Sequence, residues 1–175
     1  MDTLKPDLYE LVSALAGETV IWADQNSPRP ALPYWTMRLN VIPTLGSAGY
    51  SQGVTTDGDQ TIYRTNEGTL ALQRFGTDSE IKCHALKSDL DRMTVIAAWR
   101  AKQIACFNTG PVNNITLKLD NSTMEPRAAV DLFIRFGTRV LDRVGIIDTV
   151  RIEGEYPEAE SASVIDTVVA TAVVV

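Results

Sequence analysis

The stretch VIWADQNSPRPALPYWTMRLNV, residues 20–41, predicts two strands joined by a stiff polar connection. Val20–Ala23 is a short apolar run, and a second strand is expected from Tyr34 onward. In that second strand four apolar residues alternate with polar ones, which is the period of a strand with one buried face: Trp35, Met37, Leu39 and Val41. The prolines at 28, 30 and 33 fix φ and remove backbone donors, so the connection is extended and stiff. A rigid loop between two core strands is well placed to present side chains to a partner.

The segments on either side of this stretch predict a helix and a long strand. Helical spacing of Leu4, Leu8, Leu11, Val12 and Leu15 predicts a helix over 7–16, with Gly17 at its end. Thr61–Phe75 reads as one long strand, or as two strands with a break near residues 66–68, and its natural partner is the strand from Tyr34. Gly46–Gln60, rich in small and polar residues, is expected to be a loop.

The next segment predicts a second helix. Thr77 and Glu80 have the spacing of a capping box, with Thr77 as the N-cap. The apolar positions that follow indicate a single amphipathic helix lying on a sheet; they are Ile81, Cys83, Leu86, Leu90, Met93 and Ala97.

Three strands are predicted after that helix. Ile115, Leu117 and Leu119 alternate with polar residues, and Val144–Glu155 contains a second such run. The clearest alternation in the chain predicts a half-buried strand, with one face formed by Ala128, Val130, Leu132, Ile134 and Phe136.

These elements predict an α+β fold, mainly an antiparallel sheet packed by two helices, with an extended C-terminal β arm. We expect a domain over residues 1–156 and, over 157–175, an acidic linker followed by a Val-rich arm. Both faces of Ser163–Val175 are apolar, so an unpaired strand there would be prone to aggregation. The arm is therefore expected to pair, either with its own sheet or with a neighbouring subunit.

Composition excludes some classes of function. The chain has 175 residues and a net charge of −6, which argues against a protein that grips nucleic-acid phosphates. Cys83 and Cys106 match no metal or redox spacing, so we expect reduced, buried thiols in a cytosolic protein. We expect no signal peptide and no membrane span, since the apolar run at 164–175 is short and contains Asp166.

No set of residues predicts catalysis, a metal or a cofactor. His84 and Cys83 are adjacent on a predicted helix, where side chains point about 100° apart, so they do not form a nucleophile and base. Asp57-Gly58-Asp59 lacks the further ligands of a calcium loop and is interpreted as a turn. The glycines at 46, 49 and 53 precede no helix that would bind a phosphate. We therefore expect a protein that is not an enzyme.

Two motifs resemble a known family. Residues 22–39, WADQNSPRPALPYWTMRL, resemble the signature QNxPRPxxPYxTxRL of the phage neck terminator, or tail terminator-like, family of tailed bacteriophages. Residues 144–154, VGIIDTVRIEG, are similar to another segment of that family, with isoleucine in place of an aromatic residue. The resemblance covers residues 8–154 and leaves the Val-rich arm unmatched.

The resemblance implies a structural virion protein rather than an enzyme. It implies a ring, a homo-hexamer, at the head-proximal end of the tail, which ends growth of the tube and sheath and joins the tail to the head connector. The implied partners are other copies of the chain, the tail tube protein, the tail sheath protein and the head-tail connector protein. Genomic DNA would pass through the lumen without specific binding, and the acidic net charge suggests a negative lumen. The implied location is the neck of the virion, after assembly in the host cytoplasm.

The candidate assembly contacts lie in the stiff loop and in the C-terminal arm. They are Gln25, Asn26, Arg29, Leu32, Val168, Val169 and Val173. Arg29 has a structural alternative, in which it bonds carbonyl groups within the loop. The competing functions are another neck or tail-completion adaptor and a monomeric binding module of a prophage, which the mass in solution would distinguish from a ring.

Overall fold

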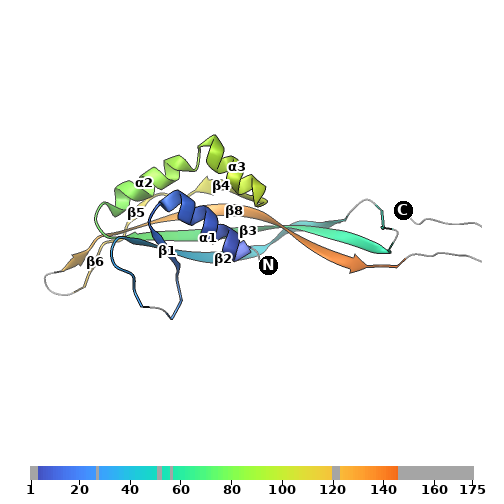
Figure 1. Cartoon of the computed structure of the whole chain (residues 1–175), viewed down its shortest axis with the longest axis horizontal. Coiled ribbons are helices and arrows are strands. Elements are labelled where there is room, and N and C mark those ends of the chain that lie inside the picture. Colours follow the sequence, from blue (N-terminus) through green and yellow to red (C-terminus); the bar gives the residue numbers. More distant parts are fainter. Residues whose placement is uncertain (1–3, 27, 51–52, 56, 120–122, 146–175) are drawn as a thin grey trace, which may run out of the picture. The chain divides into compact units, whose positions relative to one another are not determined.

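A computed structural model describes residues 4–26, 28–50, 53–55, 57–119 and 123–145 (Figure 1). Its elements, in chain order, are α1 (Leu4–Ala16), β1 (Thr19–Trp22), β2 (Tyr34–Tyr50), β3 (Asp59–Phe75), α2 (Ser79–Asp89), α3 (Met93–Ala101), β4 (Ile104–Thr109), β5 (Asn113–Asn114), β6 (Leu117–Lys118), β7 (Met124–Glu125) and β8 (Arg127–Arg143). The predicted strand over 144–155, the boundary at 156 and the C-terminal arm lie outside the described residues, apart from residues 144 and 145, which form no strand.

The chain divides into two compact units. Unit 1 contains residues 1–47 and 64–138, and unit 2 contains residues 48–63 together with residues from 139 onward. The long strands β2, β3 and β8 contribute residues to both units.

The main sheet has the strand order β1-β2-β3-β8-β4, and β5 also pairs with β8. β4 runs antiparallel to β8, with Ile104 opposite Phe136, whereas β1 runs parallel to β2, with Thr19 opposite Tyr34. A separate antiparallel pair, β6-β7, forms a small hairpin. The mostly antiparallel sheet and its helices confirm the predicted α+β class, and β3 is a neighbour of β2 as expected.

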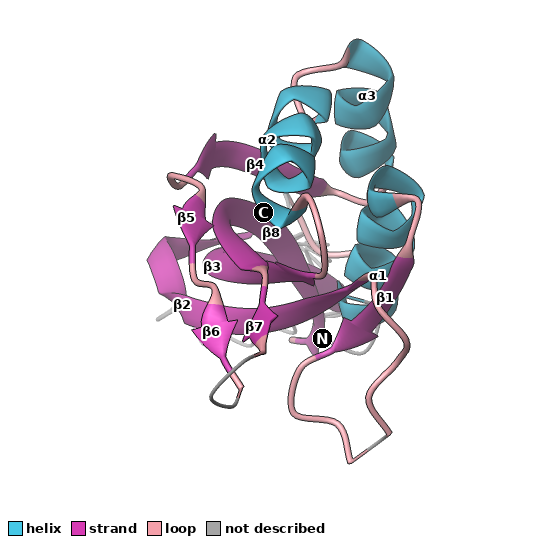
Figure 2. Cartoon of the chain, turned by 90° about the vertical axis from the view of Figure 1, so that its left-hand side faces the viewer, coloured by secondary structure: helices cyan, strands magenta, loops and turns pink. Residues whose placement is uncertain are grey.

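The core of unit 1 lies between the sheet and the helices. Figure 2 shows α1, α2 and α3 on one side of the strands. The sheet buries alternate residues toward them, as the period of a pleated strand requires. The fully buried side chains include Trp35, Met37, Leu70, Leu72, Leu132 and Ile134 from the strands, with Leu8 and Val12 from α1. The predicted alternation of β8 and the helical face of α1 are therefore confirmed.

The single helix predicted after Thr77 is wrong, because two helices, α2 and α3, occupy that segment. α2 ends at Asp89: the backbone N–H groups of Asp91 and Arg92 donate to carbonyls three residues back, and Arg92 is extended (φ −71°, ψ 132°). Two residues of the predicted apolar face are exposed: Ile81 in α2 is 67% exposed, and Met93 at the start of α3 is 76% exposed.

The predicted capping box is also wrong. Asp78, in the left-handed region with φ 60°, is the N-cap of α2, and no side-chain hydrogen bond caps the helix. The carbonyl of Thr77 instead accepts a hydrogen bond from Arg74 Nη1 at 2.5 Å. The Thr77 carbonyl is thus bonded by a side chain three residues earlier in the chain, and Asp78 rather than Thr77 occupies the N-cap position.

Two further predictions about loops and strands need correction. The loop expected over 46–60 is shorter, since β2 continues to Tyr50 and β3 begins at Asp59. The strand expected over 115–119 is reduced to Leu117–Lys118, which pairs only with β7. In both cases the pairing of neighbouring strands, rather than local composition, determines where a strand ends.

In unit 2, the ends of β3 and β8 are held together by close backbone contacts. The N–H of Gly145 donates to the carbonyl of Gly58 at 3.1 Å. A Cβ at Gly58, where φ is +78°, would lie 2.9 Å from the Cα of Gly145, so this position requires glycine. Arg143 Nε lies 3.6 Å from Asp59 Oδ1, and the guanidinium of Arg139 lies 5.8 Å from the centroid of Tyr63.

Removal of a core side chain tests the packing of unit 1. Leu72→Ala should lower the free energy of unfolding by about 2–5 kcal/mol, because it opens a cavity beneath the helices. Ile81→Ala, on the exposed side of α2, should change it by less than about 0.5 kcal/mol. Urea denaturation followed by circular dichroism measures both, and a larger loss for Ile81→Ala would contradict the exposed position of Ile81 on α2.

Candidate functional site

The loop of residues 23–33 returns the chain so that β2 can run parallel to β1. Parallel neighbours require a connection that travels back along the strand, usually through a helix. Here the extended, Pro-rich loop makes that return, and Figure 1 shows it below the sheet, opposite the helices. Its first residues are fixed by the N–H of Ala23, which donates to the carbonyl of Met37 at 2.8 Å. The next residue, Asp24, has a positive φ of 68° and accepts a hydrogen bond from Arg38 Nε at 2.9 Å.

Arg29 fastens the middle of the loop to the sheet. Its guanidinium forms an ion pair with Glu125 and lies 5.5 Å from the ring centroid of Tyr34 and 5.6 Å from that of Phe75. The two rings are stacked, with centroids 4.7 Å apart. Arg127 also pairs with Glu125 and lies 4.8 Å from the centroid of Phe75. Because Glu125 is only 3% exposed, its charge needs these cations.

The end of the loop is held by a close contact between Pro33 and the turn after β3. A Cβ at Gly76, which has φ +110°, would lie 3.2 Å from the Cβ of Pro33. The N–H of Gly76 donates to the carbonyl of Pro126 at 3.0 Å. Only glycine combines this backbone conformation with such a close approach. The loop is therefore anchored at its start, middle and end.

A groove of about 440 Å³ lies beside the anchored loop on the face opposite the helices. Its walls mix apolar, aromatic and charged side chains from the loop and from β1, β2 and β3. They are Ile21, Trp22, Ala23, Asp24, Gln25, Arg29, Tyr34, Thr36, Arg38, Asn40, Ala71, Gln73 and Phe75.

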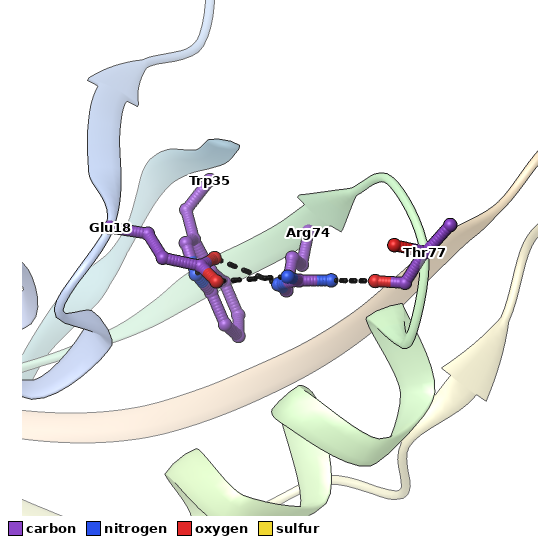
Figure 3. A network of polar contacts seen from close by, with 4 residues as sticks. All are labelled: Glu18, Trp35, Arg74 and Thr77. Atoms are coloured by element: carbon purple, nitrogen blue, oxygen red, sulfur yellow. Dashed lines mark hydrogen bonds and ion pairs between the residues drawn. The ribbon is translucent and has the colours of Figure 1, made fainter. Parts of the chain in front are cut away.

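A polar network supports the loop from the other face of the sheet (Figure 3). Arg74, which is 3% exposed, donates from Nε and Nη2 to the two carboxylate oxygens of Glu18 at 2.8 and 2.9 Å. Trp35 Nε1 donates to the same carboxylate at 3.0 Å. The hydrogen bonds from Arg74, the largest cause, lower the pKa of Glu18 although partial burial opposes them. Trp35 and Arg74 directly neighbour Tyr34 and Phe75 in the chain, so the strand ends are fixed on both faces.

Of the seven candidate contacts, the structure describes the four in the loop, and two of these, Gln25 and Arg29, line the groove. Gln25, Asn26 and Leu32 are exposed, and Leu32 is 50% exposed. Arg29 bonds a carboxylate and two rings rather than the loop carbonyls considered from the sequence. Val168, Val169 and Val173 lie outside the described residues.

Sequence reasoning missed Glu18, Arg74 and Glu125. A signal for Arg74 was present, because this charged residue continues the buried alternation of Leu70 and Leu72 in β3. No comparable signal marked Glu125, because one of its two arginine partners, Arg29, is far away in the sequence and meets it only in the fold.

The described residues can be compared with four features considered from the sequence: a metal site, the two cysteines, the turn at Asp57 and a membrane span. No group of three or more His, Cys, Asp or Glu side chains could hold a metal ion in this part of the chain. Burial raises the pKa of both Cys83 and Cys106 to about 11, so their thiols are protonated at neutral pH. Asp57 and Gly58 lie in a turn that the N–H of Gly58 closes by donating to the carbonyl of Thr55. None of the described helices is long and apolar enough to cross a membrane.

Comparison with known protein families identifies the family of this chain. A family model described as phage neck terminator protein matches residues 5–160, which is most of the chain. The chain belongs to the phage neck terminator family. Among curated proteins, none matches the sequence significantly.

Membership assigns a structural role in the neck of a bacteriophage particle and, with it, contact with other proteins of the head or tail. The match includes the anchored loop and both motifs noted in the sequence, and it ends before the Val-rich arm at 163–175.

The Arg29 contacts should control the rigidity of the loop. Arg29→Ala should accelerate cleavage within residues 25–33 by a non-specific protease and lower the stability by about 1 kcal/mol, because it releases a cation–π and ion-pair anchor. Arg92→Ala removes an exposed ion pair with Asp89, away from the loop, and serves as the matched control. Equal cleavage of the two variants would contradict the anchor.

The Glu18–Arg74 pair should make stability depend on acid pH. Because the folded pKa of Glu18 lies below its ordinary value of 4.5, its contribution is complete above that value and is lost as pH falls through the lowered pKa. Glu18→Gln should lower the melting temperature at pH 7 and flatten its decline between about pH 5 and pH 3. Glu10→Gln, in an exposed pair with Lys102, is the control and should keep the wild-type slope.

Proposed function

We propose that copies of this chain close into a ring, a hexamer, at the head-proximal end of the tail. There the ring ends growth of the tail tube and sheath and joins the tail to the head connector. The observation that carries the proposal is the anchored loop, which exposes Gln25, Asn26 and Leu32 from a backbone fixed by contacts on both sides of the sheet. Binding through such a loop costs little ordering entropy, so it suits a permanent assembly contact.

Exposed apolar side chains near the loop support a protein contact there. Figure 2 shows the β6-β7 hairpin and the β1-β2 loop projecting from the same end of unit 1. Large apolar residues that are at least 38% exposed lie on these two segments or, for Ile115, just before the hairpin: Leu32, Ile115, Leu117, Leu119 and Met124. Clustered exposed apolar surface indicates a site of protein association. We assign this surface to contacts with a neighbouring copy or with the tail tube protein, the sheath protein or the connector protein.

The C-terminal arm supplies a second contact in this proposal. Val168, Val169 and Val173 would lie on a strand added to the sheet of a neighbouring subunit, with the backbone supplying hydrogen bonds. Alternation places Val169 and Val173 on one face of that strand and Val168 on the other.

The acidic net charge suits a ring through which DNA moves. Six acidic residues and one basic residue lie in 146–175, so this segment carries most of the net charge of −6. A negative lumen would repel phosphates and let DNA slide without adhering. A positive lumen in an imaged ring would contradict this part of the proposal.

A charge placed on the loop should block assembly without unfolding the chain. Leu32→Asp should reduce incorporation into phage necks at least tenfold, measured by quantitative mass spectrometry of purified particles, while the melting temperature changes by less than about 2 °C. Tyr9→Asp, on the exposed side of α1, is the matched control. Normal incorporation of Leu32→Asp would remove the loop from the assembly contacts.

Native mass and negative-stain images of the wild type test the ring itself. A closed ring in solution or on the tail supports the proposal. A strict monomer in solution and in the particle would overturn the ring and favour a neck adaptor.

A further inference from the structure

The outer edge of β8 in unit 2 has no strand partner among the described residues. β4 pairs with β8 only as far as Phe136, and β5 pairs with Ala128 and Ala129. The remaining neighbour of β8 is β3, on the other side. Residues Arg139–Arg143 therefore leave one row of backbone donors and acceptors unpaired by any described strand.

This edge also exposes apolar side chains on both faces of the strand. Val140 is 53% exposed and Leu141 is 62% exposed. Adjacent residues of a strand point to opposite faces, so each face carries one of them. Val144, just beyond the strand, is also exposed. An exposed edge with apolar residues on both faces favours the addition of a strand that is itself apolar on both faces.

We propose that the edge Arg139–Arg143 receives the Val-rich segment Ser163–Val175 of a second copy of the chain. This inference rests on the ring proposed above and names the surface that accepts the arm. The segment is long enough to cover the five residues of the edge and is apolar at successive positions. Its apolar side chains could therefore contact Val140 on one face of the edge and Leu141 on the other.

Charge supports the same pairing. Arg139 lies over the ring of Tyr63 and forms no ion pair with a carboxylate among the described residues, and the side chain of Arg143 is 88% exposed. The segment that precedes the arm contains Glu153, Glu155, Glu158 and Glu160. These carboxylates would flank the edge when the arm is bound and meet its two arginines.

The intervening chain favours a second copy over the same copy. Nineteen residues, 144–162, would separate β8 from the arm, whereas strands of a hairpin are usually joined by 2–5 residues. A charged segment repels itself and extends, so it is suited to reaching a neighbouring subunit. An arm that binds the edge of the next copy produces a head-to-tail contact, which can close into a ring.

Two variants and their mixture test this inference. Deletion of 163–175 removes the arm and keeps the edge, and Leu141→Asp disturbs the edge and keeps the arm. Neither variant alone should form the wild-type assembly by native mass spectrometry, whereas their equimolar mixture should form a 1:1 pair that cannot extend. Ile81→Asp, an exposed apolar position on α2, is the control and should assemble like the wild type.

A peptide experiment tests the contact directly. A fluorescent peptide of residues 153–175 should bind the chain lacking 163–175, and Leu141→Asp in that background should weaken binding at least tenfold. A second edge variant, Val140→Asp, should have the same effect from the opposite face, and circular dichroism verifies that each variant is folded.

The outcomes of these experiments distinguish failure of the arm contact from failure of the proposed ring. Wild-type assembly by the deleted chain would exclude the arm as the subunit contact while the neck ring still stands. The arm would belong to its own sheet if the wild type is a monomer and binds no added peptide, while the chain that lacks 163–175 does bind the peptide. A 1:1 pair in the mixture, without incorporation of the wild type into phage necks, would support the contact and contradict the proposed function.

Discussion

The pairing of buried Arg74 with Glu18 is the constraint on which the geometry of the site depends. A guanidinium that is almost fully buried is unfavourable unless its charge and donors are satisfied. Glu18, just before β1, satisfies it together with the carbonyl of Thr77, just before α2. The same carboxylate accepts from Trp35 in β2. One interaction therefore ties the starts of β1, β2 and α2 to the end of β3.

This constraint connects the core to the exposed loop. Because neighbouring strand residues point to opposite faces, fixing Trp35 and Arg74 on the helix side also fixes Tyr34 and Phe75 on the other side. The stacked rings of Tyr34 and Phe75 then form the platform on which Arg29 lies. The exposed loop is consequently tied to the sheet, which is a useful property in a neck protein that must fit its neighbours.

The accuracy of the sequence predictions followed the range of the interactions involved. The alternation around Leu132 and the helical spacing around Leu8 were read correctly, since burial against a single core imposes a period on the chain. The capping box at Thr77 failed because Asp78, in the left-handed region, is the N-cap of α2, and the helix thought to continue through Met93 breaks before Arg92. The sequence did not predict that β2 continues beyond Gly46, because that part of the strand is held by pairing and shows no apolar alternation.

By itself, the sequence determined that residues 20–41 form two strands around a stiff loop, since proline chemistry and a two-residue period are local properties. It also placed Gln25, Asn26 and Leu32 in that loop. Only the tertiary structure decided that the two strands run parallel, that Arg29 is bound to Glu125 and two rings, and that Glu18 neutralises Arg74. These outcomes depend on groups far apart in the chain, whose meeting no local pattern encodes.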